Sequence, residues 1–427
     1  MRFAFLRIAF RQPEGQLLHF CLISIFYPPY SFGGDSIYLY RLATELVRRG
    51  HQVDVIHCSD SFHLLQAQVD PSAFPVTEGV TVHRLESGWG SLGPLLAHQT
   101  GRPLTTGEKV REILESKRFD VVHYHNISLF GPGVLEIEPS YAPPKLYSAH
   151  DHWLVCPMSV LWKNRSQVCD RPTCISCTVR SGRPPQWWRY GGLLKRAARH
   201  VDQFLSPSRF TARMHRERGF EEDFEVLNYF LDPVEELTGD GAPSPHERPY
   251  YLFVGRLEKY KGVQDLIEAF RGPGDYDLII VGSGAYEKTL RAQAEGCARI
   301  RFAGWVSQEH LGPYYANALA VLAPSVTYET FGIIVIEANA RGISVVVRDL
   351  GPLPEIIEDG GGGVVFRDQA ELVRCMEALY RDGDFRRGLG RQGRKSFLEK
   401  WTPDAHLERY FALIERARRR REARGSS

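Results

Sequence analysis

The strongest constraint on the fold is a repeated pattern of short apolar runs, each followed by a turn and an amphipathic stretch. The first run, 17–26, is apolar enough for a strand buried on both faces of a parallel sheet. A helical pattern follows at 36–49 and ends at Gly50. Further strands are expected at 52–57, 80–85, 121–123, 145–149 and 204–206. This alternation predicts βαβ units, and hence a parallel sheet covered by helices on both faces.

The pattern starts again after a segment rich in Gly, Pro, Ser and charge, 237–248, which reads as a linker. Beyond it, strands are expected at 250–254, 276–281, 300–302, 320–323, 344–347 and 363–366, with helices at 263–270 and 286–294. A chain of 427 residues also exceeds the roughly 250 residues that one core usually supports.

We therefore predict an α/β protein with two doubly wound, Rossmann-like domains that face each other across a cleft. The first domain is 1–236 and the second is 249–400; residues 401–427 form a helix that crosses back to the first domain and ends in a basic tail. A ligand is expected in the cleft, at the carboxyl ends of the strands.

Composition narrows the classes of partner. The formal net charge of +2 gives no argument for binding nucleic acid. No run reaches the roughly 20 apolar residues of a membrane-spanning helix. The apolar start, 1–10, contains two arginines and no small-residue cleavage site, which favours an extension over a signal peptide. Eight cysteines in so long a chain do not suggest a disulfide scaffold, and a reducing cytoplasm is the expected location.

The stretch 325–338 carries the strongest functional signal. Glu329 and Glu337 are eight residues apart, so one carboxylate can lie at the start of a helix and the other further along the same face. The amides of Phe331, Gly332 and Ile333 would point out of the helix N-terminus, where anions bind. A ligand with hydroxyls at both ends and phosphates between them suits this layout. An amphipathic helix with two solvated glutamates is the alternative.

Two loops add to that signal. Arg256 and Lys261 follow the first strand of the second domain, and two cations at a strand end suit a diphosphate. Gly33 and Gly34 follow the first strand of the chain, in a loop whose backbone can approach a phosphate closely. Taken alone, the first loop can also be a solvated basic turn and the second an ordinary glycine turn.

In this order, the motifs resemble the retaining family 4 glycosyltransferases, whose architecture, called GT-B, has two Rossmann-like domains. The resemblance runs from about 17 to 410 and includes the two glycines, the loop with Arg256 and Lys261, the pair Glu329 and Glu337, and the closing Trp401-Thr402.

The resemblance implies a role for each site residue. Arg256 and Lys261 would hold the donor diphosphate with help from the Gly34 amide. Glu337 would accept hydrogen bonds from the ribose, and Glu329 with the amides that follow it would hold the transferred sugar. His150 would contact the sugar and the acceptor, and the backbone near Val306 would contact the edge of the donor's nucleotide base.

The resemblance also implies the reaction. A sugar would move from a nucleotide-diphosphate donor to a glycan, lipid-linked or small-molecule acceptor, with retained anomeric configuration and no cofactor or metal in the chemistry. Asn228-Tyr-Phe-Leu-Asp replaces the family's usual Asn-Gly-Val-Asp, so the hinge is expected to differ. A nucleotide-sugar epimerase, a phosphorylase and an inactive binding protein of the same fold remain alternatives.

Two segments lie outside this scheme. Cys156, Cys169, Cys174 and Cys177 form an insertion whose Cys-x2-Cys spacing favours a structural zinc site, with an iron–sulfur cluster or unliganded or paired thiols as alternatives. The segment 180–219 has ten lysines or arginines against two acids and includes Trp187 and Trp188. It suits peripheral contact with the inner face of the cell membrane or an acidic acceptor, and a solvated helix is the plain alternative. The arginine-rich end, 415–424, is expected to be a frayed helix end.

Overall fold

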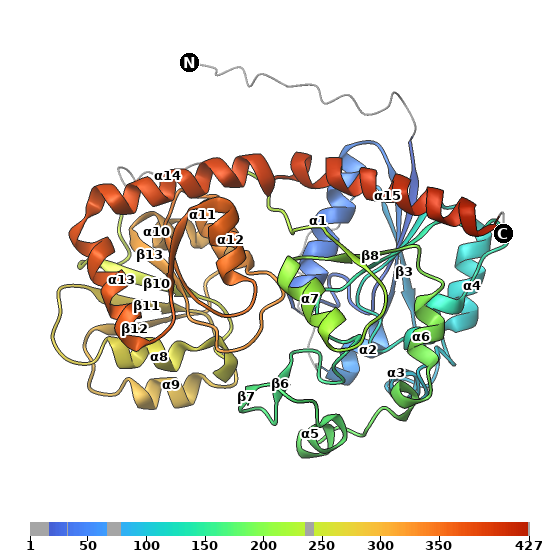
Figure 1. The fold of residues 1–427 in the computed structure, drawn as a ribbon, viewed down its shortest axis with the longest axis horizontal. Helices are drawn as coiled ribbons and strands as arrows, with labels where there is room; N and C mark the ends of the chain where they lie inside the picture. Colours follow the sequence, from blue (N-terminus) through green and yellow to red (C-terminus); the bar gives the residue numbers. More distant parts are fainter. Residues whose placement is uncertain (1–16, 32, 66–77, 235–242, 426–427) are drawn as a thin grey trace.

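The computed structural model describes residues 17–31, 33–65, 78–234 and 243–425, so the N-terminal stretch 1–10 and part of the expected linker lie outside the described residues. Two parallel sheets lie side by side (Figure 1). The first has seven strands in the order β3-β2-β1-β4-β5-β8-β9. Their bounds are β1 His19–Ile23, β2 Gln52–Cys58, β3 Val80–Leu85, β4 Val121–Tyr124, β5 Lys145–Ser148, β8 Gln203–Ser206 and β9 Phe224–Val226.

The second sheet has six strands in the order β12-β11-β10-β13-β14-β15. Their bounds are β10 Tyr250–Val254, β11 Asp277–Val281, β12 Ile300–Gly304, β13 Ala318–Ala323, β14 Val345–Arg348 and β15 Gly363–Phe366. All pairings within both sheets are parallel. In each sheet the strand order reverses beside the first strand, which is the doubly wound arrangement and creates a crevice at the carboxyl ends. The predicted fold class is confirmed.

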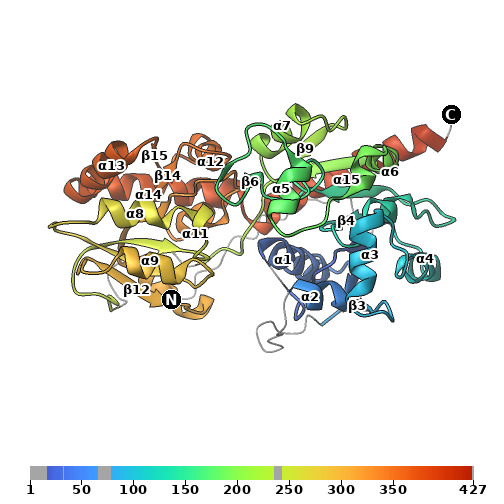
Figure 2. The ribbon, with the colours of Figure 1, turned by 90° about the horizontal axis from the view of Figure 1, so that it is seen from below.

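Helices lie on both sides of each sheet (Figure 2). In the first domain they are α1 Gly34–Arg48, α2 Ser59–Leu65, α3 Leu92–Thr100, α4 Gly107–Ser116, α5 Cys174–Arg180, α6 Leu193–Ala198 and α7 Arg209–Glu217, with the 3-10 turns η1 Pro132–Glu136 and η2 Trp187–Tyr190. In the second domain they are α8 Val263–Ala269, α9 Glu287–Gln293, α10 Gly312–Ala316, α11 Ile333–Asn339, α12 Leu353–Gly360, α13 Gln369–Arg381 and α14 Gly383–Lys400, with η3 Lys259–Lys261 and η4 Gln308–His310.

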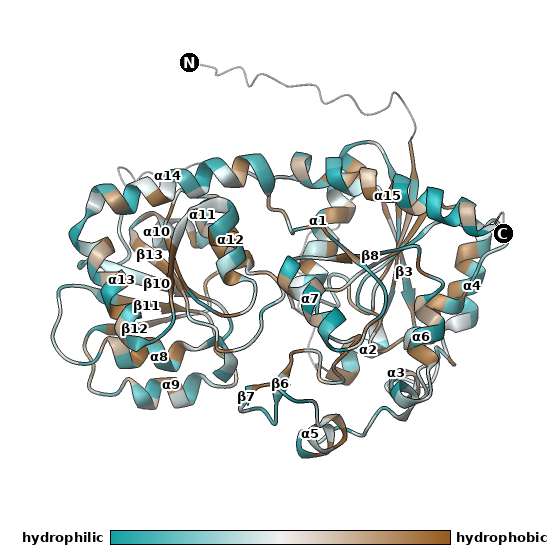
Figure 3. Ribbon diagram, viewed as in Figure 1, coloured by the Kyte–Doolittle hydropathy of each residue, from teal (hydrophilic) through white to brown (hydrophobic). Residues whose placement is uncertain are grey.

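The apolar strands form the core of each domain, and the helices present one apolar face to them (Figure 3). Strands β4, β5, β8 and β11 are buried along their whole length. Burial on both faces explains why none of them shows the alternation of apolar and polar residues that is typical of a half-exposed strand, and why β11 is apolar from Leu278 to Val281. The carboxyl ends of the strands, where polar loops begin, are left to form the site.

A last helix, α15 (Pro403–Gly425), leaves the second domain after α14 and runs across the first (Figure 1). Its side chains enter the first domain: Tyr38 Oη lies 3.1 Å from Nε2 of His406, and Tyr410 Oη lies 2.8 Å from Nδ1 of His123. The two domains are therefore joined twice, by the segment after β9 and by this helix.

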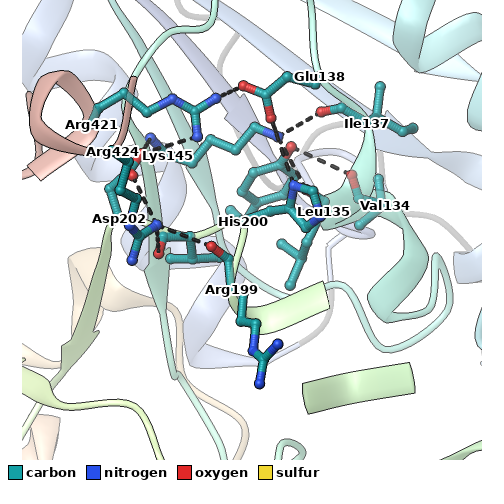
Figure 4. Close-up of polar contacts among 12 residues, drawn as sticks. Val134, Leu135, Ile137, Glu138, Lys145, Arg199, His200, Asp202, Arg421 and Arg424 are labelled. Atoms are coloured by element: carbon teal, nitrogen blue, oxygen red, sulfur yellow. Dashed lines mark hydrogen bonds and ion pairs between the residues drawn. The ribbon is translucent and has the colours of Figure 1, made fainter. Parts of the chain in front are cut away.

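The arginine-rich end of α15 is helical to Gly425 and bound to the first domain, so the expectation of a frayed end is wrong. Arg421 pairs with Glu138, and Arg424 lies 3.2 Å from the buried carboxylate of Asp202 (Figure 4). Beside them the fully buried Lys145 donates to the carbonyl oxygens of Leu135 and Ile137 at 3.0 and 2.7 Å. Acidic groups and free carbonyls in the first domain thus hold the arginines in place.

Within the described ranges, none of the helices combines the length and apolar character needed to cross a membrane.

Candidate active site

A cleft of about 960 Å³ lies between the domains, at the carboxyl ends of both sheets. From the predicted set it is lined by Gly33, Gly34, His150, Arg256, Lys261, Glu329, Phe331, Gly332, Ile333 and Glu337. Val306 is not among the lining residues; its side chain packs against the apolar core. The structure therefore brings together ten of the residues that the sequence singled out for sugar-nucleotide binding.

The loop after β10 places Arg256 and Lys261 on the second-domain side of the cleft. The loop ends at Gly262, whose φ of 77° is left-handed. A Cβ atom there would lie 2.0 Å from the carbonyl oxygen of Pro324, so the turn requires glycine. Arg256 Nη2 donates to the hydroxyl of Tyr260 at 2.9 Å, which directs the guanidinium along the loop.

Glu329 lies within this cationic loop. Its Oε1 accepts from Lys261 Nζ at 2.7 Å and from the Ser325 hydroxyl at 2.6 Å. Burial alone would raise the pKa of this carboxyl, but the charge and hydrogen bond of Lys261 and the bond from Ser325 outweigh it, so the pKa lies below its usual value. Glu329 is therefore a fixed carboxylate that can accept hydrogen bonds from hydroxyl groups.

Glu337 lies eight residues further along the chain, within α11, whereas Glu329 lies in the loop before that helix. Its Oε2 accepts from the Tyr315 hydroxyl at 3.2 Å. Burial raises its pKa, and the charges of Arg41 and Arg341 act in the opposite direction. The two glutamates thus differ in environment: one is paired with a lysine and the other is buried near two arginines.

The first domain contributes the glycine loop between β1 and α1. Gly33 has a left-handed φ of 88° and precedes the helix, and a Cβ on Gly34 would lie 3.6 Å from Cδ1 of Ile333. The loop therefore comes close to the start of α11 across the cleft. Asp35 follows at once; Asn126 donates to it at 2.8 Å, and burial raises the pKa of its carboxyl.

His150 lines the cleft, but both of its ring nitrogens already have protein partners. Nε2 is 2.8 Å from Nδ1 of His125, and Nδ1 is 2.7 Å from the hydroxyl of Tyr229. Burial lowers the pKa of His150 to about 3, so the ring is neutral at physiological pH. This geometry suits a histidine held in a fixed orientation at the cleft wall better than one that exchanges protons.

The cysteine insertion forms the hairpin β6–β7 (Trp162–Lys163 and Gln167–Val168) followed by α5. All four thiols are free, and among the described residues no three His, Cys, Asp or Glu side chains gather in a metal-binding group. The thiols lie close enough for their charges to interact. The Asn164 amide also donates to Sγ of Cys177 at 3.4 Å. The prediction of a zinc site from Cys156, Cys169, Cys174 and Cys177 is not confirmed, because these side chains do not gather into a metal-binding group in the described part of the chain.

Three further lining residues were not singled out from the sequence. Asp151 is a partly exposed residue next to His150, and desolvation of its carboxyl raises the pKa to about 7. Tyr229, from the segment that joins the domains, contacts His150 and also stacks edge-on against Phe331 at 5.5 Å. Asp35 directly follows the two glycines. In the sequence, the only sign that these three residues line the cleft was their position next to recognised motifs. Tyr229 stood out only because it belongs to the segment that departs from the family's usual Asn-Gly-Val-Asp.

Two Rossmann-like domains with glycine, arginine, lysine and paired glutamates around the cleft between them define the GT-B class of glycosyltransferase. The family model described as "Glycosyltransferase Family 4" matches residues 32–234, and the one described as "Glycosyl transferases group 1" matches residues 239–396. The chain belongs to the family 4 glycosyltransferases, and the enzyme class predicted from the sequence is confirmed.

Characterised relatives differ in the reactions that their names describe. The chain is 28% identical to a glycogen synthase of Mycobacterium tuberculosis, covering 84% of this chain and 86% of that protein. It is 27% identical to a phosphatidyl-myo-inositol mannosyltransferase of Mycobacterium leprae, covering 83% and 86%.

Solved structures are similar in fold. A sucrose-phosphate synthase of Thermosynechococcus elongatus superposes with a TM-score of 0.70 at 20% identity, covering 96% of this chain and all of that one. HepE of Anabaena, in complex with UDP, gives 0.64 at 16% identity, covering 93% and 100%.

Proposed function

We propose that this protein is a retaining, metal-independent glycosyltransferase that uses a nucleotide-diphosphate sugar as donor. The observation that carries the proposal is the charge pattern of the cleft. Arg256 and Lys261 lie on one wall and the Gly33-Gly34 backbone on the other, with Glu329 and Glu337 beside the cations. Cations and amides suit a diphosphate, and carboxylates suit the hydroxyls of the sugar and ribose at its two ends.

The same pattern suits the chemistry of transfer. Cleavage of the bond from sugar to diphosphate builds negative charge on the leaving oxygen and positive character on the sugar. Arg256 and Lys261 are held in place by the protein, so they stabilise that anion more in the transition state than in the ground state. The fixed Glu329 carboxylate lies close to the region where the sugar becomes positive. Retention follows when the acceptor attacks from the side on which the diphosphate departs and gives its proton to the leaving phosphate.

The donor class has support from related structures, because HepE of Anabaena has been solved with UDP and with UDP-glucose. In this chain Lys261 would keep one ammonium N–H on Glu329 and direct the others to phosphate oxygens. Phe331, Gly332 and Ile333 line the same cleft, so their amides would be available to the donor.

Two assays test the proposal. First, a panel of nucleotide diphosphates is screened by thermal shift. Next, labelled nucleotide sugars that correspond to the best binder are incubated with a panel of acceptors. Label in a new glycoside with retained configuration, undiminished by EDTA, is the expected result. Isomerised donor would identify an epimerase, and phosphate-dependent cleavage would identify a phosphorylase. Failure of every nucleotide diphosphate to stabilise the protein would favour an inactive binding protein.

Location and membrane contact form a finer part of the proposal. The protein would act in the cytoplasm, in contact with the inner face of the cell membrane through residues 180–219 and the helix before them. Trp187 and Tyr190 are each more than 60% exposed, Val179 is 59% exposed, and basic side chains surround them. Apolar tips flanked by cations suit an anionic bilayer surface. Sedimentation with phosphatidylglycerol vesicles, but not with phosphatidylcholine vesicles, is expected, and loss of that difference in Trp187→Ala/Tyr190→Ala is the check.

A further inference from the structure

The cleft extends beyond the predicted donor residues to the cysteine insertion. At that end it is lined by Met158, Ser159, Val160, Trp162, Arg165 and Arg183. These residues belong to the first domain, on the side opposite Arg256 and Lys261. A cleft of about 960 Å³ is near the upper end of common ligand pockets, so it has room for an acceptor group beside a donor.

Local structure places Arg165 and Arg183 near each other. Arg165 lies in the turn of the β6–β7 hairpin with a left-handed φ of 57°, and its Nη2 donates to the carbonyl oxygen of Ser181 at 3.0 Å. Ser181 ends α5, two residues before Arg183. The hairpin turn is tied to the same helix, because the neighbouring Asn164 amide donates to Sγ of Cys177. The insertion thus acts as a scaffold that holds two guanidinium groups at one end of the cleft.

No acid neutralises this pair within the described residues. Neither Arg165 nor Arg183 forms an ion pair with a carboxylate there, and both side chains are exposed to the cleft and solvent. Arg189 lies behind them, stacked 4.6 Å from the ring of Trp188 and 5.1 Å from that of Trp153. It is half-buried, and its buried Nη2 has no hydrogen-bond partner among the described residues.

The charges of Arg183 and Arg189 also affect the pKa of a nearby histidine, His98. Burial and the nearby charges of Arg183 and Arg189 together lower the pKa of His98 to about 4, and burial is the largest cause. A positively charged region in which a histidine stays neutral, and in which Arg165 and Arg183 have no carboxylate partner among the described residues, favours an incoming anion.

We propose that Arg165 and Arg183 form an acceptor subsite that binds a phosphate or diphosphate group carried by the sugar acceptor. The inference rests on the proposed function, because it assumes that the donor occupies the opposite wall. A guanidinium group presents two parallel N–H donors that match two phosphate oxygens, and Arg165 keeps donors free after its one bond to Ser181. A phosphorylated sugar and a lipid-linked sugar diphosphate share this chemistry. Membrane binding alone does not explain the pair, because both arginines line the cleft rather than only the outer surface.

The test uses the full-length protein and two phosphate-bearing probes, glucose 1-phosphate and farnesyl diphosphate, with glucose and farnesol as uncharged counterparts. Binding is measured by calorimetry, first without nucleotide and then with a saturating nucleotide diphosphate that keeps the probes off Arg256 and Lys261. The test variant is Arg165→Gln/Arg183→Gln. The matched control is Arg171→Gln/Arg180→Gln, which removes the same charge from exposed arginines of the same segment that do not line the cleft.

The expected result is that at least one charged probe binds to wild type and control in the presence of nucleotide, and at least tenfold more weakly to the test variant. The uncharged counterparts should show no such difference. Preference for glucose 1-phosphate or for farnesyl diphosphate identifies a soluble or a lipid-linked source. Failure of both probes to bind wild type, equal binding by all variants, or equal loss in the control overturns the inference. So does a loss that appears only with anionic vesicles, which would assign the arginines to membrane contact. If no nucleotide stabilises the protein, the proposed function fails, and the nucleotide-free titration still tests the subsite.

Discussion

At the scale of single residues, the ion pair between Lys261 and Glu329 joins a cation suited to the donor's diphosphate to a carboxylate suited to the hydroxyls of its sugar. The lysine is held 2.7 Å from the glutamate, so its position is set before any donor arrives. A positioned ammonium loses little side-chain entropy when it binds a phosphate, and it does not have to reorganise as charge develops. Its partner carboxylate in turn stays ionised beside the cation.

Substitution of this lysine should therefore reduce turnover without unfolding the protein. We expect Lys261→Ala to lower kcat/KM by about 10²–10³, because the variant loses one fixed charge from the transition state. The control is Arg271→Ala, which removes an exposed cation of the same domain that pairs with Glu268 near the end of α8 and donates to the Gln293 carbonyl oxygen. Steady-state kinetics with the best donor and circular dichroism measure both properties. Near-normal turnover in Lys261→Ala would contradict the assignment of this loop to the diphosphate.

The desolvated carboxyl of Asp151 leads to a prediction about stability and pH. Burial raises the pKa of its carboxyl to about 7, far above the roughly 3.9 expected in an unfolded chain. Between these values the native state holds a proton that the unfolded state has lost, so the stabilising effect is present at low pH and is lost as pH rises towards 7. At pH 8 the native state contains a buried charge, which Asp151→Asn removes.

We expect Asp151→Asn to be more stable relative to wild type at pH 8 than at pH 5, by up to about 3 kcal/mol, because only about two of the pH units below the native pKa lie in this range. Asparagine keeps a side-chain oxygen that can accept the bond from the Trp153 amide, which is 2.7 Å long in the native chain. Asp223→Asn, at a carboxylate that is 86% exposed, is the control and should show no such pH dependence. Urea unfolding at the two pH values measures the difference, and an equal effect at both would refute the raised pKa.

At the scale of elements, ion pairs with the first domain hold the end of α15 in place, although its composition alone predicts a solvated helix end. Six arginines in ten residues suggest repulsion and fraying, but the first domain offers Glu138, Asp202 and free carbonyl oxygens along the path of the helix. Cations near a helix C-terminus also interact favourably with its dipole. These partners come from distant parts of the sequence, so a local reading does not find them.

Arg421→Ala tests this anchor. Its side chain is 18% exposed and contacts both Glu138 and Asp202. We expect a loss of about 2 kcal/mol, less than the roughly 3–5 kcal/mol of a fully buried pair, because Arg424 still faces Asp202. The melting temperature should fall by a few degrees. Arg419→Ala, on the same helix but exposed, should change it little; equal shifts in both would mean that the arginines act only through helix propensity.

Sequence reasoning worked best for strands with clear ends. Strands β3, β10 and β15 begin and end at the predicted residues, because polar or glycine-rich turns border their apolar runs. The first strand is shorter than its apolar run, since residues 24–26 leave the sheet ladder and remain buried. The insertion was the least predictable part. Its hairpin and α5 have no strong periodicity, and the cysteine spacing pointed to a metal instead.

For the site, the sequence motifs predicted which residues lie together at the cleft, but not which hydrogen-bond partners each of them has. The carboxyl ends of parallel strands converge, so loops after β1, β10 and β13 had to lie near the cleft. The two partners of His150 could not be inferred, because His125 and Tyr229 come from separate segments. Val306 shows the converse: its role was carried over from the family for the backbone and did not depend on any local pattern, and its partly buried side chain packs against the core.

At the scale of the whole molecule, α7 and the donor loop are already in contact across the cleft. The hydroxyls of Ser208 and Thr211 donate to the Thr330 carbonyl oxygen at 2.8 and 3.0 Å. The ring of Phe210 lies 4.9 Å from that of Tyr328. Arg209 adds an ion pair with Asp359 of α12 at 2.9 Å. These contacts join the start of α7 to the segment that carries Glu329, so the relative position of the domains and the shape of the donor site are coupled.

Charge reversal at Arg209 should open this arrangement. Arg209→Glu would face Asp359 and Glu358 with a like charge, and burial is too slight for the side chain to affect either core. An exposed pair contributes at most about 1 kcal/mol, and reversal adds repulsion of similar size, so the closed population and the affinity for donor should fall by about tenfold or less. We therefore expect a larger radius of gyration by small-angle scattering and a raised KM for donor with little change in kcat at saturation. Arg216→Glu is the control, since Arg216 lies on the same helix and faces only Asp223 of its own domain. An unchanged radius together with an unchanged KM would mean that α7 does not govern closure and that the second connection, through α15, alone sets how the domains meet.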